Sequence, residues 1–107
     1  MNKIKFSHNW NNKLNHNIFT TIRKYAEEKY SYYNNLIGKE FEILLNEKKI
    51  EEANLIDIDI CDFKIIPKGL LHVDTGIINN YEIEDLFKMF GINKNDKVLI
   101  LTFKRIE

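Results

Sequence analysis

The chain has 107 residues, 44% of them hydrophobic, and its 16 basic and 16 acidic side chains give a formal net charge of zero. This length and composition predict one domain over residues 1–107 with a core that needs no metal or disulfide, and they exclude collagen-like, low-complexity and disordered classes. No apolar run approaches the roughly 20 residues of a membrane span, so we expect no membrane partner. We also expect a cytoplasmic protein, because no apolar signal region is visible at the N-terminus and Cys61 is the single cysteine.

The N-terminal segment predicts a strand followed by a short helix. Residues 3–7 alternate polar and apolar side chains, which is typical of a strand. Ser7 would then cap a short helix over about 8–16. Trp10 and Leu14 lie four residues apart in that helix and would share its buried stripe.

Residues 18–24 predict a second strand. They are rich in β-branched and aromatic side chains, which favour extended structure. Because side chains alternate between the two faces of a strand, Thr21 and Arg23 are expected to point the same way. One face would take Ile18, Thr20 and Ile22, and the other Phe19, Thr21 and Arg23.

The middle of the chain predicts a hairpin. Segment 25–37 is ambiguous and reads as a helical turn followed by a loop, after which residues 40–45 predict a strand. Residues 46–49 are typical of a hairpin turn. In the extended run that follows, isoleucines alternate with aspartates over 56–60, which predicts a half-buried strand, and Pro67 would end the ladder.

The last third predicts a loop, a helix and a strand. Residues 68–80 hold two glycines and read as a loop. Residues 81–92 carry an apolar helical face, with Asn80 as the expected N-cap and Gly91 as the expected C-cap. The face consists of Ile83, Leu86, Phe87 and Phe90. Residues 97–104 give the strongest strand pattern and are expected in a central position. This order of elements predicts a small α+β fold, a mostly antiparallel sheet or pseudobarrel with two or three short helices.

The zero net charge hides an asymmetry between the two halves of the chain. Residues 1–50 carry nine basic and five acidic side chains, whereas residues 51–107 carry seven and eleven. Residues 1–26 contain five basic side chains, no acidic one and four aromatic residues. Such a segment predicts phosphate contacts and base stacking. The alternative is that these basic side chains are solvated, or are covered by opposite charge from the C-terminal half.

The histidines and the cysteine give little indication of chemistry. None of the histidines has a His or Cys partner at metal-ligand spacing, so we expect surface residues, no metal site and no cofactor. The three are His8, His16 and His72. Cys61 is expected to be structural, because the neighbouring Asp59 and Asp62 would raise its pKa.

Asp74, Thr75 and Gly76 resemble the active-site triplet of aspartic proteases. That chemistry needs two carboxylates that share one proton, and a second copy of the chain would have to supply the other. The alternative interpretation is a turn. In that turn Gly76 has a positive φ and Asp74 accepts hydrogen bonds from nearby backbone N–H groups.

One set of polar residues combines positive charge, hydroxyl groups and a carboxylate. The set is Lys13, Thr20, Thr21, Arg23 and Asp74. A lysine whose pKa is lowered by burial serves as a base, and a threonine hydroxyl beside it becomes a nucleophile. Arg23 offers a planar fork to a phosphate, a carboxylate or a base edge, and Asp74 would orient the lysine. In the alternative interpretation the threonines are ordinary strand residues and Arg23 pairs with an acid.

Several segments resemble the ASCH domains of the PUA-like superfamily. They are Lys13-Leu14, Phe19-Thr20-Thr21-Ile22-Arg23 and Gly38-Lys39-Glu40-Phe41, with residues 97–104 in the place of the family's closing strand. More narrowly, the segments SHNWNNKL, FTTIR and DTG resemble short bacterial and phage proteins of the same kind. The resemblance implies a small β-barrel with a cleft beside the Thr-Ile-Arg strand, and RNA or nucleotide binding as the activity.

The resemblance also implies an alternative activity. Some short members of the family are amidohydrolases that deacetylate modified cytidine. They use a lysine and a threonine in a Lys-x-x-Thr-Ile-Arg arrangement, together with a distant glutamate. Thr21 and Arg23 match this pattern, but Ile18 stands at the position of the lysine. Lys13 would have to reach the cleft from the preceding helix, and Asp74 is the nearest candidate for the distant carboxylate.

Three functional hypotheses therefore stand side by side. The first is an RNA- or nucleotide-binding domain, whose ligand would contact Trp10, Lys13, Thr20, Thr21 and Arg23. The second is a small hydrolase that acts on a modified nucleoside through Lys13, Thr21 and Asp74. The third is a protein-interaction module whose acidic second half meets a basic partner. In the first hypothesis Trp10 is a stacking surface or a wall of the cleft, and the alternative places it in the core.

Overall fold

The computed structural model describes residues 2–77 and 79–106, with every side chain in these ranges except those of Trp10, Asn11, Asn12, Val73 and Asn80. The five strands are β1 (Asn2–Phe6), β2 (Ile18–Lys24), β3 (Glu40–Leu45), β4 (Lys48–Asp62) and β5 (Lys97–Arg105). The α-helices are α1 (Glu27–Asn34), α2 (Lys68–Thr75) and α3 (Asn80–Met89), and the 3-10 helices are η1 (Trp10–Asn15) and η2 (Phe63–Ile65). The stacking or cleft-wall role expected of Trp10 concerns a side chain that lies outside the described ones.

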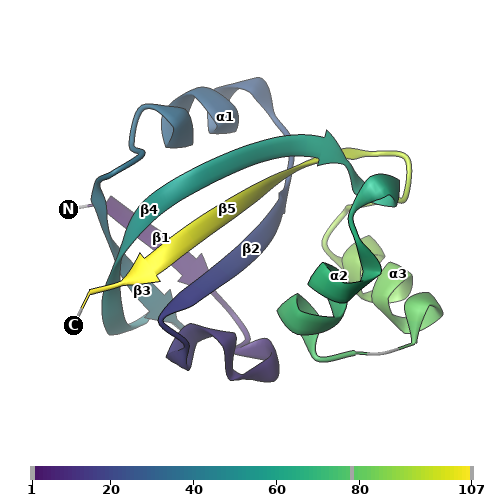
Figure 1. Ribbon diagram of the computed structural model, residues 1–107, viewed down its shortest axis with the longest axis horizontal. Coiled ribbons are helices and arrows are strands. Elements are labelled where there is room, and N and C mark those ends of the chain that lie inside the picture. Colours follow the sequence, from purple (N-terminus) through teal and green to yellow (C-terminus); the bar gives the residue numbers. More distant parts are fainter. Residues whose placement is uncertain (1, 78, 107) are drawn as a thin grey trace.

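The strands form one mixed sheet in the order β1-β3-β4-β5-β2. β1 pairs with β3 in parallel, and the other three pairings are antiparallel. The sheet curls without closing into a barrel, so β1 and β2 remain its two edges (Figure 1). The predicted α+β pseudobarrel with two or three short helices is confirmed, with its sheet open between β1 and β2. β5 has a partner strand on each side, as expected for residues 97–104.

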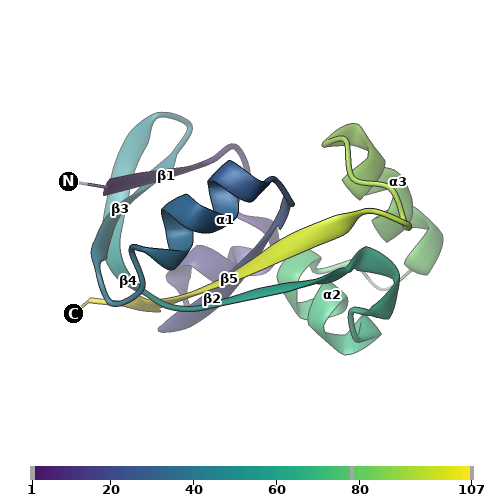
Figure 2. The same ribbon diagram turned by 90° about the horizontal axis from the view of Figure 1, so that it is seen from above.

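Each face of the sheet carries a hydrophobic cluster, and the two clusters are separate. In the first cluster, Phe103 stacks on Phe19 and meets Phe41 edge to face. In the second, Ile22 and Val98 pack with side chains of α2 and α3, which lie side by side at one end of the sheet (Figure 2). The alternation predicted for the second strand is confirmed, because Phe19 and Ile22 enter different clusters. β2 therefore carries polar side chains toward two different surroundings.

Helix α2 corrects the loop predicted over residues 68–80. Its glycine, β-branched and aspartate residues have low helix propensity, so the local sequence hides a helix that tertiary packing stabilises through Leu71 in the second cluster. The helix ends at Gly76, whose φ of 75° agrees with the predicted positive value. The turn expected around Asp74 is wrong, because this residue lies in the last turn of α2 and its side chain bonds to other side chains.

The other local elements agree more closely with prediction. The hairpin expected at 46–49 has its turn at Asn46 and Glu47, whose φ values of 52° and 70° are typical of a two-residue loop. Helix α3 is present, but each cap lies one residue before the predicted one, at Asn79 rather than Asn80 and at Phe90 rather than Gly91. The Asn79 side chain accepts hydrogen bonds from two backbone N–H groups of the first turn. Segment 25–37 contains the eight-residue helix α1, which buries no residue of its own.

A β-bulge changes the burial pattern predicted for residues 56–60. The register of β4 against β5 shifts between Leu55 and Asp57, so Ile56 is the extra residue. Leu55 is fully buried, whereas Ile56 is 42% exposed and Ile60 is exposed as well. After the extra residue the alternation is shifted, so Ile58 lies opposite Leu101 and packs partly buried against the first cluster. Of the three isoleucines in the predicted stripe, Ile58 is therefore the one that contacts the core, and Ile56 and Ile60 are exposed.

Candidate ligand-binding site

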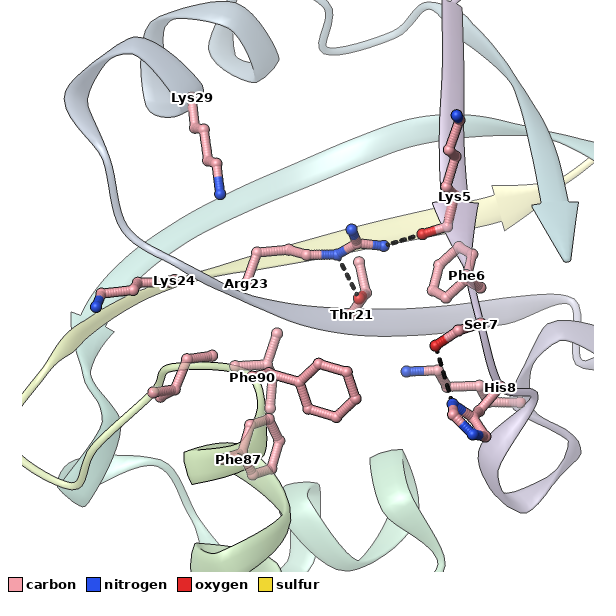
Figure 3. Close-up of a pocket in the computed structure, with 13 residues that line it drawn as sticks. Lys5, Phe6, Ser7, His8, Thr21, Arg23, Lys24, Lys29, Phe87 and Phe90 are labelled. Carbon is pink, nitrogen blue, oxygen red and sulfur yellow. Dashed lines mark hydrogen bonds between the residues drawn. The ribbon is translucent and has the colours of Figure 1, made fainter. Parts of the chain in front are cut away.

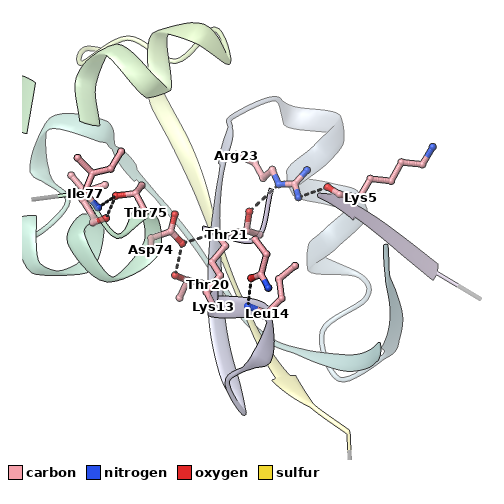
Figure 4. A network of polar contacts seen from close by, with 11 residues as sticks. Lys5, Lys13, Leu14, Thr20, Thr21, Arg23, Asp74, Thr75 and Ile77 are labelled. Carbon is pink, nitrogen blue, oxygen red and sulfur yellow. Dashed lines mark hydrogen bonds and ion pairs between the residues drawn. The ribbon is translucent and has the colours of Figure 1, made fainter. Parts of the chain in front are cut away.

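Three elements meet at a buried polar network (Figure 4). Lys13 comes from η1, Thr20 from β2 and Asp74 from α2. Lys13 Nζ donates to Asp74 Oδ1 over 3.0 Å, and the Thr20 hydroxyl donates to the same oxygen over 3.0 Å. The side chains of Lys13 and Asp74 are 6% and 1% exposed. The expected contact between the carboxylate and the lysine is therefore present.

Local hydrogen bonds fix the two ends of this network. Asn9 Oδ1 accepts from the backbone N–H of the fully buried Leu14, which holds η1 against the first cluster. At the end of α2, Thr75 Oγ1 donates to the carbonyl of Leu71 and accepts from the backbone N–H of Ile77. Because both helices are anchored next to the network, the positions of its two charged groups are determined by the fold.

Lys13 has a lowered pKa in this environment. The main cause is burial, which disfavours the ammonium form, and the nearby charge of Arg23 acts in the same direction. Asp74 opposes both through its charge and its hydrogen bond. The balance makes Lys13 a more readily deprotonated amine than a surface lysine, which is the property required of a general base.

Arg23 bridges the open side of the sheet. Its Nε donates to Thr21 Oγ1 over 3.1 Å within β2, and its Nη2 donates to the carbonyl oxygen of Lys5 on β1 over 2.9 Å. The guanidinium carbon lies 5.0 Å from the centroid of the Phe6 ring, within cation–π distance. Burial lowers the pKa of Arg23, and the charges of Tyr33 and Asp74 oppose this shift. These contacts hold the guanidinium in one orientation.

A pocket of about 230 Å³ opens beside Arg23 (Figure 3). Five of its lining residues are cationic, namely Lys5, Lys13, Arg23, Lys24 and Lys29. Apolar side chains of β1, β2, α3 and the segment after α3 line it as well, and Ser7, His8 and Thr21 add polar groups. No carboxylate is among the described residues that line this pocket. The pocket therefore combines concentrated positive charge with apolar surface.

The predicted site residues divide between the pocket and the network behind it. Lys13, Thr21 and Arg23 line the pocket, whereas Thr20 and Asp74 do not. Lys13 belongs to both, since it lines the pocket and bonds to Asp74. Side chains alternate along β2, so Thr20 points to the opposite face from Thr21, where it bonds to Asp74.

Among the pocket residues that were not predicted as site residues, Lys29 and Phe90 matter most for a ligand. Lys29 comes from α1, whose helical pattern is weak, and it reaches the pocket because α1 follows β2 directly. Phe90 was expected on the buried face of the last helix but follows α3 and is 47% exposed. Gly91, with a φ of 78°, reverses the chain there. The basic character of residues 1–26 already indicated the other four cations of the pocket, which are Lys5, Lys13, Arg23 and Lys24.

Two further tests concern metals and membranes. Within residues 2–77 and 79–106 no group of three or more His, Cys, Asp and Glu side chains is arranged to hold a metal ion. No helix in those ranges is long and apolar enough to cross a membrane.

The pKa of the Cys61 thiol is raised, as predicted. Burial is the largest cause, and the charges of Asp59 and Asp62 act in the same direction.

Comparison with known proteins rests on the fold. No family model and no curated protein matches the sequence. The crystal structure of an ASCH domain from Lactobacillus crispatus JV V101 is similar with a TM-score of 0.63 and 14% identity, over 87% of this chain and 67% of that one. A protein from Enterococcus faecalis V583, assigned to the DUF984 family, is similar with a TM-score of 0.62 and 7% identity, over 99% of this chain and 76% of that one. The predicted resemblance is confirmed at the level of structure, because the chain shares the fold of this ASCH domain structure.

Proposed function

We propose that this protein binds RNA or a nucleotide in the pocket beside β2. The observation that carries the proposal is the convergence of five cationic side chains on one pocket with no carboxylate among its described lining residues. Basic side chains supply most of the affinity of proteins for nucleic acids, because they neutralise phosphates and release counterions. The half-exposed ring of Phe90 offers a surface on which a base stacks.

The cations have distinct places in this function. Lys24 and Lys29 are exposed, so they are available to phosphate groups at the mouth of the pocket. Arg23 is held by Thr21 and by the carbonyl of Lys5, and it presents its remaining N–H donors without further loss of conformational entropy. Thr21 accepts a hydrogen bond from Arg23, and the buried Lys13 lines the pocket.

Salt-dependent binding of single-stranded RNA tests this proposal. We expect a fluorescein-labelled oligoribonucleotide to bind with an affinity that falls steeply with salt. The double variant K24Q/K29Q should reduce the slope of log K against log salt by about 1.4, at about 0.7 for each phosphate contact. The control variant K39Q/K48Q changes two exposed lysines outside the pocket and should leave the slope unchanged. Absence of RNA and nucleotide binding at low salt would contradict the proposal and would favour the protein-interaction hypothesis.

A second candidate function is hydrolysis of an acylated nucleoside. It is favoured by one observation, which is that Asp74 holds Lys13 at 3.0 Å while Lys13 and Thr21 line the same pocket. Lys13 has the lowered pKa of a general base. Arg23 Nε donates to Thr21 Oγ1, which would stabilise negative charge on that oxygen during attack.

Turnover of N4-acetylcytidine tests this candidate. If the protein is a hydrolase, T21V should abolish acetate release, whereas T20V should retain it, because Thr20 faces Asp74 and lies outside the pocket. Equal activity in the two variants, or no acetate release by the unmodified protein, would contradict a nucleophilic Thr21. The RNA-binding proposal does not depend on this result.

A further inference from the structure

We propose that the pocket is specific for a terminal phosphomonoester, so that its ligand is a nucleoside monophosphate or the phosphorylated end of an RNA chain. This inference rests on the proposed function and deepens it. Three observations carry it, namely the number of cations without an acidic partner, the fixed geometry of Arg23 and the small volume between a basic wall and an apolar wall.

The first observation concerns the charge that remains for a ligand. Three of the five cations have a carboxylate close by, since Lys13 pairs with Asp74 at 3.0 Å, Lys5 with Glu47 at 3.3 Å and Lys24 with Asp96 at 3.9 Å. Arg23 and Lys29 have no carboxylate within 4.0 Å among the residues that the structure describes. Two uncompensated positive charges therefore face the pocket.

These two charges match a terminal phosphate better than an internal one. A phosphomonoester carries a charge of about −1.5 to −2 at neutral pH. A phosphodiester within an RNA chain carries a single negative charge, and a protein that follows a backbone needs its cations spread along a groove. Here the cations converge on one pocket, from β1, β2, η1 and α1. This convergence favours one dianionic group.

Arg23 supplies an oriented set of donors for this group. Two of its five N–H donors are used, one for Thr21 Oγ1 and one for the carbonyl of Lys5. The remaining donors lie on a guanidinium that cannot rotate freely, because the Phe6 ring supports its face. A planar, fixed arginine binds two oxygens of a phosphate at once, which a flexible lysine does not.

The shape of the pocket limits the ligand to one nucleotide unit. Its volume of about 230 Å³ is smaller than the roughly 300 to 1,000 Å³ of sites for drug-sized ligands. Figure 3 shows Lys29 and Arg23 on one side, and Phe87 and Phe90 on the other. A ligand with phosphate at one end and an apolar, stackable face at the other is complementary to both walls.

Calorimetric titration with matched ligand pairs tests the inference. We expect cytidine and adenosine 5′-monophosphates to bind at least about tenfold more tightly than the corresponding nucleosides, because hydrogen bonds to charged groups are stronger than those between neutral groups. In a second arm, a 5′-phosphorylated hexaribonucleotide is compared with its 5′-hydroxyl form, and a 3′-phosphorylated form is included. Tighter binding of a phosphorylated end identifies an RNA terminus, and tight binding of monophosphates alone identifies a free nucleotide.

Variants at matched positions make the test specific. K29Q should reduce the preference for phosphate about fivefold, as expected for a solvent-accessible ion pair, while K39Q should leave it unchanged. If phosphorylated and hydroxyl RNA bind equally and monophosphates bind no better than nucleosides, the inference is overturned and the proposed function stands. If none of these ligands binds, the proposed function fails with it.

Discussion

Replacement of Asp74 by alanine tests whether the buried ion pair secures α2 to the sheet. The substitution leaves the ammonium group of Lys13 in a site where its side chain is 6% exposed, without its acidic partner. It also removes the acceptor of the Thr20 hydroxyl. Removal of one partner of a buried pair costs about 3–5 kcal/mol, because the other charge is left uncompensated.

This loss is large compared with the stability of a small protein. Native proteins unfold with a free energy of about 5–15 kcal/mol, so D74A should remove a substantial part of it. T20V removes one donor to the same oxygen and should cost only about 1 kcal/mol. Urea unfolding followed by circular dichroism measures both free energies on the same scale.

A double-mutant cycle separates the ion pair from simple loss of packing. The variants are K13M, D74L and K13M/D74L, in which the double variant replaces both charges by apolar groups of similar size. We expect the double variant to be more stable than D74L, because no uncompensated charge remains. A coupling energy close to zero, or a cost of D74A below about 1 kcal/mol, would refute the idea that this pair holds α2 in place.

Two other predictions concern pH and the bulge. Burial lowers the pKa of Lys13 below 10.5 in the folded chain. Between the lowered pKa and 10.5 the unfolded chain therefore binds more protons than the folded chain, so the free energy of unfolding rises as pH rises through this window and falls as pH falls. The difference in unfolding free energy between the unmodified protein and K13M should therefore rise from neutral pH toward 10.5, and a falling difference would contradict this assignment. For the bulge, L55A should cost about 2–5 kcal/mol because Leu55 is fully buried, whereas I56A should cost less than about 1 kcal/mol in the same urea titration, and equal costs would contradict the register.

The sequence predicted the sheet well because strand signals are local. The two-residue alternation of residues 18–24 and the apolar run of residues 97–104 need no information from elsewhere in the chain. The bulge at Ile56 is different, since it depends on how β4 pairs with β5. Alternating isoleucines and aspartates look the same whether they precede or follow an extra residue, so the buried face could not be assigned from the pattern.

Helix α2 and Phe90 were mispredicted for a related reason. Residues 68–75 have weak helix propensity, and their helix exists because Leu71 and its neighbours pack on the second cluster. Phe90 fits the helical spacing of the buried residues before it, but α3 ends at Met89. A helix end displaced by one or two residues is enough to move a large ring from the core to the rim of a pocket.

The candidate site combines a part that is local and a part that is not. The sequence placed Thr21 and Arg23 on one face of a strand, and the pocket contains both. The contact between Lys13 and Asp74 spans 61 residues, and only the docking of α2 creates it. The position of Asp74 beside Lys13 therefore depends on the integrity of the second cluster. It follows that loss of ligand binding in an Asp74 variant would report on the fold, whereas loss in a Lys29 variant, whose side chain is exposed, would report on the ligand.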